Sequence, residues 1–209
     1  MNRQTRKRLA TRQKISDVAT GLFIEHGFDQ VTVDEIAEAA DVSRMTVFNH
    51  FARKEDMFFD LDQEGREDLF IALQTKDPAT PAVEALRLFA HRALAERRPY
   101  VRFFERGSER FIKTVRGSEA LKARARAIRD ELSDALNIAL AESAQRPLPD
   151  PAAYLAASLL LATWTVALNE GYRVYEQEKD VEKAKKTFLR LVDQGSKGVQ
   201  AAMEGTPYV

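Results

Sequence analysis

The chain of 209 residues contains no cysteine and only three histidines, His26, His50 and His91. Disulfide bonds and thiol catalysis are therefore excluded, and the histidines are too scattered for a local metal-binding motif. The sequence also lacks the glycine-rich phosphate loops and the serine elbow that mark common enzyme classes. We expect a protein that is not an enzyme and that uses no metal and no cofactor.

Long hydrophobic runs are nearly absent as well. The N-terminus is basic without a following apolar segment, which is not the pattern of a signal peptide. One uncharged run, residues 152–169, approaches the length that crosses a bilayer, but alanine, serine and threonine dilute it. We interpret this run as a helix buried within protein, not as a membrane span, and we expect a cytoplasmic protein.

Neither sign of charge is in excess, since 32 Lys and Arg balance 32 Asp and Glu. The distribution is uneven, however. Residues 1–14 carry basic side chains and no acid, whereas residues 55–68 are strongly acidic. A basic end beside an acidic stretch predicts an anionic partner that contacts only the first part of the chain. The alternative is a solvated, disordered terminus.

Apolar residues recur with helical spacing along nearly the whole chain, and no strand-like alternation persists. We therefore predict an all-α fold of about nine helices. One helix is expected from Lys54 to about Leu73, and another is expected to begin at Pro99. Cap and proline pairs at Thr80 and at Asp150 indicate two further helix starts.

Two very short helices are predicted close together near the start of the chain. Thr32 and Glu35 have the spacing of a capping box, and Ser43 is a cap for the next helix. Asp41 lies in the turn between them, where a left-handed backbone is expected. Helices of this length do not persist alone, so the pair predicts a helix-turn-helix whose second helix enters a DNA major groove.

Several side chains on the outward face of that second helix suit DNA. Arginine can fork onto guanine and asparagine onto adenine, while threonine, histidine and lysine suit phosphates. With Lys54 at the start of the following helix, the expected face contains Arg44, Met45, Thr46, Phe48, Asn49 and His50. The alternative is a helical hairpin that binds protein through a polar face, in which case binding would depend little on salt.

The segment LFIEHGFDQVTVDEIAEAADVSRMTVFNHFARKEDMF, residues 22–58, resembles the N-terminal signature of the TetR family, the tetracycline-repressor-like regulators. The spacing agrees without a gap. The resemblance implies a homodimeric transcriptional regulator, usually a repressor, that a small molecule releases from a palindromic double-stranded DNA operator. It also implies a helix-turn-helix DNA-binding domain over residues 1–53 and a helical effector-binding and dimerisation domain over residues 54–209.

The resemblance carries roles onto individual positions. Arg44 and Met45 occupy the usual base-contacting positions. The other DNA-binding positions that it implies are Thr32, Val33, Thr46, Phe48, Asn49, His50 and Lys54. Of these, the two threonines, the histidine and the lysine would contact phosphates.

Three residues depart from the family pattern. Asp41 stands where glycine is typical. Phe48 stands where a tyrosine usually gives its hydroxyl to a phosphate, and a phenylalanine has no hydroxyl to give. Arg53 stands where a capping serine or asparagine is common.

The last two predicted helices are expected to form the dimer interface. The helix that begins at Pro151 is apolar nearly all round, so both of its sides should be covered. The final helix offers an apolar stripe that includes Phe188 and Leu191. The alternative is a monomeric bundle.

Aromatic side chains gather in the C-terminal part of the chain. At helical spacing they are more often core than pocket, but a pocket for an apolar or amphipathic effector would draw on some of them. The candidates are Phe104, Phe111, Trp164, Asn169 and Tyr172. The alternative to a ligand-released repressor is a constitutive helical dimer that binds DNA without an effector.

Overall fold

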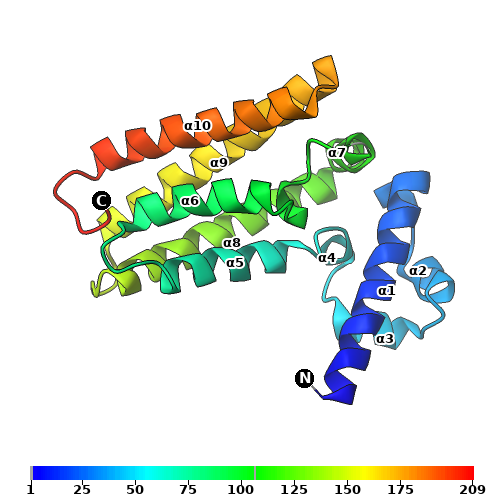
Figure 1. The fold of residues 1–209 in the computed structure, drawn as a ribbon. Coiled ribbons are helices and arrows are strands. Elements are labelled where there is room, and N and C mark those ends of the chain that lie inside the picture. The colour runs from blue at the N-terminus through cyan, green and yellow to red at the C-terminus, as the bar shows by residue number, and fades with distance from the viewer. Residues whose placement is uncertain (1, 106) are drawn as a thin grey trace. The chain divides into compact units, whose positions relative to one another are not determined.

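The computed structural model describes residues 2–105 and 107–209, which are built from helices (Figure 1). Within these residues there are ten α-helices, two short 3-10 helices and no strand. The predicted all-α fold is confirmed, with one helix more than expected.

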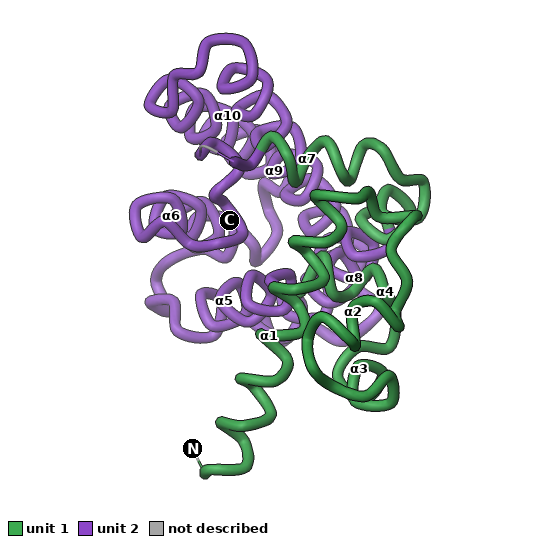
Figure 2. Tube along the Cα trace, turned by 90° about the vertical axis from the view of Figure 1, so that its right-hand side faces the viewer, with its two compact units in different colours: residues 1–60, 109–126 green, residues 61–108, 127–209 purple. Residues whose placement is uncertain are grey.

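The chain divides into two compact units (Figure 2). Unit 1 comprises residues 1–60 and 109–126, and unit 2 comprises residues 61–108 and 127–209. Helix α8, Glu119–Ser143, contributes its first turns to unit 1 and the remainder to unit 2. The unit that contains the N-terminal helices therefore also takes in a segment from the middle of the chain.

Unit 1 is built mainly from the N-terminal helices. Its elements, besides the start of α8, are α1 (Arg3–His26), a 3-10 turn (Phe28–Gln30), α2 (Val33–Ala39), α3 (Arg44–His50), α4 (Lys54–Phe58) and α7 (Ser108–Gly117). The basic N-terminus forms the first turns of α1 and is not disordered coil, since Asn2 caps that helix by accepting from the Thr5 N–H at 2.8 Å. Gly27 ends α1 with a φ of 88°, a conformation that glycine adopts without strain.

Helix α7 and the start of α8 complete the core of unit 1. The Phe111 ring stacks on the Phe58 ring with the centroids 4.4 Å apart. Leu121 is fully buried in the same cluster. The Arg124 guanidinium adds a salt bridge to Asp56 at 2.8 Å. The middle segment of the chain therefore stabilises the unit that carries α2 and α3.

Unit 2 is a helical bundle with two long final helices. Its elements, besides the rest of α8, are α5 (Asp62–Gln74), α6 (Ala82–Ala95), a 3-10 turn (Pro99–Val101), α9 (Pro151–Glu178) and α10 (Val181–Ala202). Helices α9 and α10 run side by side (Figure 1). The two helices approach closely at Gly195. A side chain at this position would clash with α9, since a Cβ there would lie 2.2 Å from the Thr163 methyl carbon. Asp150 and Asp180 cap the two helices with their side chains.

The prediction of one continuous helix from Lys54 to Leu73 is wrong. The chain leaves the helix after Phe58 and re-enters one at Asp62. At the break, the Asp60 carboxylate forms a salt bridge with Arg12 of α1. The break divides the expected helix into α4 and α5, which gives the additional helix.

Two other boundaries also differ from the sequence prediction. Pro99 opens only a 3-10 turn, and the next helix begins at Ser108 after Gly107, whose φ of 100° is not helical. Helix α6 begins one residue later than expected, with Pro81 and not Thr80 at its N-cap.

The apolar stripe of α10 lies inside the subunit. Phe188 is fully buried, with Ala184 and Val192 on the same face, and its ring meets Trp164 of α9 edge-on at 5.5 Å. The prediction that Phe188 lies in a dimer interface is therefore wrong, because α9 and α6 of the same chain already cover this face. Leu191, beside it, is half-buried.

Helix α9 is the only helix in the described residues that is long and apolar enough to cross a membrane. Its most apolar window has a mean hydropathy of 1.6, and 28% of that window is buried within the chain. A single helix of this kind is weak evidence for a membrane span, because core helices of soluble proteins have the same length and composition.

Candidate nucleic-acid interface and effector site

Helices α2 and α3 are fixed by their own side chains. Thr32 Oγ1 accepts from the Glu35 N–H at 3.2 Å, and the Glu35 carboxylate accepts from the Thr32 N–H at 2.7 Å, which confirms the predicted capping box. Ser43 Oγ accepts from the Thr46 N–H at 3.0 Å. Asp41 in the turn has a φ of 53°, the left-handed conformation expected there. This is the geometry of a helix-turn-helix.

One face of the α2–α3 pair is buried and the other is open. Ile36 and Val47 are fully buried in the core of unit 1. On the opposite side of α3, Met45 is 68% exposed and Phe48 is 43% exposed, and Asn49 is exposed as well. Large apolar side chains left in water beside polar ones are typical of a surface that a partner covers.

Arg44, the first residue of α3, has two neighbours in the free protein. Its Nη1 forms a salt bridge with Asp34 Oδ2 of α2 at 2.7 Å. Its guanidinium carbon lies 5.6 Å from the centre of the Phe48 ring. Sequence reasoning placed Arg44 on the open face but missed Asp34.

The two threonines expected at phosphates already have hydrogen bonds. Thr32 Oγ1 donates to Glu35 Oε2 at 2.8 Å, and the hydrogen bonds from Thr32 lower the pKa of that carboxyl. Thr46 Oγ1 lies 2.8 Å from Ser43 Oγ. Val33 is half-buried. The phosphate contacts of Thr32 and Thr46 stay predictions, because each threonine hydroxyl already takes part in the hydrogen bonds of a helix cap.

Lys54 has a structural role that the sequence did not reveal. Its ammonium donates to the carbonyl oxygens of Phe28 and Val31, at 2.8 Å each, and lies 4.2 Å from the centre of the Phe28 ring. An ammonium has three protons, so one remains for a phosphate. Lys54 therefore ties the start of α4 to the turn before α2.

Arg12 is a second such residue. Its guanidinium lies 4.0 Å above the Phe51 ring, donates to the carbonyl oxygen of His50 and pairs with Asp60. Its position three residues before Ile15, on the edge of the buried face of α1, is the signal that could have identified it. Arg12 therefore stabilises the end of α3 and is not part of a free basic arm.

Burial, with the charges of Arg8 and Arg12, lowers the pKa of His50. Its imidazole is therefore neutral at pH 7 and offers one N–H donor to a phosphate. The remaining basic side chains at the start of α1, all of them exposed, are Arg3, Arg6, Lys7 and Arg8.

Residues 15–61 match the protein family described as bacterial regulatory proteins, tetR family. The matched segment runs from within α1 through α4 and so contains the whole helix-turn-helix. The N-terminal segment of the chain thus carries the TetR-family helix-turn-helix. The resemblance seen in the sequence is confirmed.

Curated relatives match in the same region. A Mycobacterium tuberculosis protein named for the regulation of mycofactocin biosynthesis, MftR, is 49% identical over 53 residues, which cover 25% of this chain and 27% of that protein. The transcriptional regulator AcrR of Shigella flexneri is 34% identical over 84 residues, 39% of each chain. The chain thus spans less than half the length of the curated relatives it matches. Both relatives are named as transcriptional regulators.

Solved structures extend the likeness to the fold of both units. The complex of SmeT with triclosan has a TM-score of 0.55 and 20% identity, over 92% of this chain and 91% of that one. SmeT is the repressor of the Stenotrophomonas maltophilia multidrug efflux pump SmeDEF. At this identity the match concerns the fold alone.

The aromatic residues predicted to bind an effector do not form one group in the structure. Phe104 and Trp164 both pack on Phe188 in unit 2, with ring centroids 5.8 and 5.5 Å from it. Tyr172 is buried in the same unit, whereas Asn169 of α9 is exposed. Phe104 also lies against Gly171, where a Cβ would come within 2.7 Å of its ring.

Phe111 belongs to unit 1, where it stacks on Phe58. Its ring also meets Phe59 edge-on, with the centroids 6.3 Å apart. The five candidates are therefore divided between an aromatic group in unit 2 and the core of unit 1.

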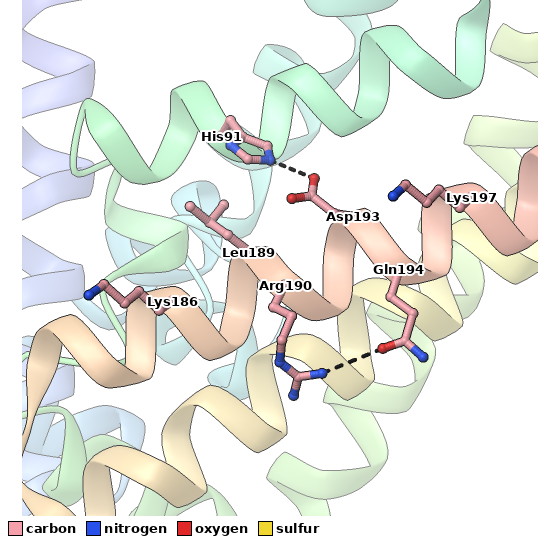
Figure 3. Close-up of a pocket in the computed structure, with 7 residues that line it drawn as sticks. All are labelled: His91, Lys186, Leu189, Arg190, Asp193, Gln194 and Lys197. Atoms are coloured by element: carbon pink, nitrogen blue, oxygen red, sulfur yellow. Dashed lines mark hydrogen bonds and ion pairs between the residues drawn. The ribbon is translucent and has the colours of Figure 1, made fainter.

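An open hollow in unit 2 lies between α6 and α10, with a volume of about 540 Å³ (Figure 3). Its lining, which includes none of the predicted effector residues, is His91, Lys186, Leu189, Arg190, Asp193, Gln194 and Lys197. His91 points to Asp193, with 2.7 Å between Nε2 and Oδ1, and Arg87 pairs with the same carboxylate at 2.8 Å. His91 of α6 is thus held by the Asp193 carboxylate of α10.

Helix α9 leaves several large apolar side chains in water. Tyr154, Leu155 and Val166 are 53%, 46% and 52% exposed within the single chain. Other residues of the same helix, including Ala156, Ala157 and Trp164, pack in the core of unit 2. An uncovered apolar face on an otherwise packed helix is typical of a protein–protein interface.

Proposed function

We propose that this TetR-family chain is a ligand-responsive, DNA-binding transcriptional regulator, acting as a repressor that a small molecule releases from a palindromic operator. The observation that carries this proposal is the open face of α3, where Arg44, Met45 and Asn49 project from a helix that its caps and core fix in place. In this proposal residues 1–53 bind DNA, and effector binding and dimerisation lie within residues 54–209.

Each part of the surface has a physical role in this mechanism. Arg44 forks onto guanine and Asn49 pairs with adenine, which supplies sequence preference. Met45 and Phe48 make apolar contacts in the groove. His50, Thr32, Thr46 and Lys54 contact phosphates, and the exposed basic residues of α1 add a sequence-independent, salt-dependent attraction.

The proposal requires a homodimer, since a palindromic operator has two half-sites about 34–36 Å apart along the duplex. The exposed apolar face of α9 supports this assembly, with Leu155 and Val166 as its central side chains. Covering that face with a second copy also explains the apolar composition of α9 without a membrane. We infer a cytoplasmic protein that acts on DNA and is not an enzyme.

The effector is proposed to be apolar or amphipathic and to bind among the aromatic side chains of unit 2. The Phe104, Trp164 and Tyr172 side chains supply the apolar lining that such a ligand needs. The complex of SmeT with triclosan is an example of a protein of this fold with a small molecule bound. Because α8 belongs to both units, a shift of α8 in unit 2 would reach unit 1 through the helix itself.

Selection of bound sequences from random duplex DNA tests the DNA-binding proposal. The recovered sequences should share a palindrome with half-site centres about 10 base pairs apart. Changing Arg3, Arg6, Lys7 and Arg8 to alanine should weaken binding to all sequences alike and flatten the salt dependence, by about 0.9 in the log–log slope for each phosphate that is no longer neutralised.

The matched control removes the same number of basic charges from α10, at Lys185, Lys186, Arg190 and Lys197. It should leave the slope unchanged, because this face is not proposed to contact DNA. Equal flattening by both variants would show a general charge effect, and recovery of no common sequence would argue against an operator.

Trp164 is the single tryptophan and provides a test of the effector. An apolar phenol such as triclosan, titrated into the protein, should change Trp164 fluorescence and weaken operator binding over the same concentrations. A coupling free energy of about 1–3 kcal/mol corresponds to a loss of affinity of about 5- to 150-fold. A compound that changes the fluorescence but leaves operator affinity intact is a bystander, and a broad screen without any doubly active compound would favour a constitutive regulator.

A further inference from the structure

Asp34 is an acidic residue placed where the proposed DNA surface should be basic. It lies in the first turn of α2, outside the helix proposed to enter the groove, and is 65% exposed. A carboxylate here is repelled by DNA phosphates, so the charge by itself disfavours binding. Its contact with Arg44, 2.7 Å from Nη1 to Oδ2, indicates what it contributes instead.

The Arg44 guanidinium is held on one edge and on one face. Asp34 accepts from Nη1, and the Phe48 ring lies 5.6 Å from the guanidinium carbon. A guanidinium has five N–H donors in a rigid fork, and a guanine takes two of them. The salt bridge therefore leaves enough donors for a guanine while limiting the directions in which the side chain can point.

The solvent exposure of the Arg44 and Asp34 side chains indicates whether their salt bridge stabilises the fold or orients Arg44. Arg44 and Asp34 are 61% and 65% exposed, and ion pairs in such positions add little to folding stability. An arginine side chain that is already ordered loses less entropy when it binds. The pair thus matters mainly for how Arg44 is presented to its partner.

We propose that Asp34 is a positioning residue that orients Arg44 for one base pair of each half-site, so that it raises selectivity while lowering affinity for DNA in general. This inference rests on the proposed function, because it requires Arg44 to contact a base. The carboxylate has two opposite effects: it repels every phosphate backbone, and it holds the fork of Arg44 in place for one base.

The test compares Asp34→Ala with Arg44→Ala and with the double variant. Each is measured by competition binding against the operator selected with the unchanged protein and against all its single-base-pair substitutions. A bidentate arginine contact discriminates by roughly 5- to 150-fold. Asp34→Ala should lower discrimination at the Arg44 base pair by about threefold or more and should strengthen binding to unrelated DNA.

The double variant should discriminate at that base pair no better and no worse than Arg44→Ala alone, because Asp34 acts through Arg44. Glu38→Ala is the matched control. Glu38 is exposed on the same helix, so its removal takes away the same charge without touching Arg44. It should strengthen general binding and leave the base preference unchanged. If a substitution destabilised α2, binding to all DNA sequences would weaken alike, which differs from a loss of preference at one base pair.

Three outcomes overturn the inference. Unchanged discrimination in Asp34→Ala would show that Arg44 needs no positioning. Relaxed preference at a different base pair would show that Asp34 contacts a base itself, as a carboxylate can with cytosine. If Arg44→Ala relaxed no base pair at all, the base-contacting role in the proposed function would fail together with the inference.

Discussion

Replacing Val166 with glutamate is expected to leave the chain folded as a monomer and to weaken operator binding at least about a hundredfold. Val166 is 52% exposed in the single chain, so a glutamate there stays solvated in the monomer and does not disturb the bundle. In a dimer built on α9 the same carboxylate would be buried without a partner, which costs about 3–5 kcal/mol. Every 1.4 kcal/mol is about tenfold in affinity, so the dimer would dissociate at working concentrations.

Sedimentation and operator titration measure the two effects separately. Leu88→Glu is the control, since Leu88 has a similar exposure of 46% but lies on α6. The Leu88→Glu protein should remain a dimer and should bind the operator with unchanged affinity. A Val166→Glu protein that still sediments as a dimer would show that the assembly uses another surface, and an unchanged protein that sediments as a monomer would contradict the dimer itself.

Changing Tyr208 to alanine is expected to have the largest effect on folding stability. Tyr208 is fully buried in the core of unit 2, near the C-terminus. Its hydroxyl donates to Asp150 Oδ2 at 2.7 Å, and its carbonyl oxygen accepts from the Val83 N–H at 3.2 Å. Removing a buried aromatic side chain of this kind costs about 3–5 kcal/mol of the free energy of unfolding. Val209→Ala, at an exposed neighbour, should change it by less than about 0.5 kcal/mol.

Tyr208→Phe isolates the hydroxyl. Burial, and then the nearby Asp150 carboxylate, raise the pKa of Tyr208 to about 12, so the hydroxyl remains a donor at neutral pH. The hydrogen bond from Tyr208 is the main cause that lowers the pKa of Asp150, whose carboxylate also caps α9. Stability from a carboxyl with a lowered pKa is present above its unfolded pKa of about 3.9 and declines as the pH falls through the folded value.

Denaturant unfolding at several pH values checks this pair. The stability difference between the unchanged protein and Tyr208→Phe should be present at pH 7 and should shrink below about pH 4 as Asp150 is protonated. A difference that is constant down to pH 2 would show that the substitution removes packing, not a hydrogen bond to a carboxylate. A Tyr208→Ala protein as stable as the unchanged one would contradict the central place of Tyr208 in the core.

The helix-turn-helix could be predicted from the sequence because its signals are local. The Thr32–Glu35 capping box and the Ser43 cap join atoms three residues apart, and Asp41 sets the backbone of its own turn. Contacts over so short a distance depend on the chain order and on few other residues. The open face of α3 follows from the same periodicity that buries Val47.

The contacts that hold this unit together were not predictable in the same way. Lys54 bonds to carbonyl groups 23 and 26 residues earlier in the chain, and Arg12 pairs with Asp60 48 residues later. A basic residue near a proposed DNA surface can contact either a DNA phosphate or its own chain. The sequence alone cannot distinguish these two roles. Asp34 is a similar case, because its neighbour Arg44 lies across the turn on another helix.

The sequence by itself therefore determined the helical class, the helix-turn-helix and the side chains on its open face, since helical period, caps and turn residues act within a few positions of the chain. Only the tertiary structure decided which apolar faces are covered. Phe188 and Val166 are both apolar residues of the last two helices, yet Phe188 is fully buried within the chain and Val166 is left exposed. The spacing of apolar residues shows which face of a helix is apolar. Packing among helices distant in sequence determines whether the same chain or a second molecule covers that face.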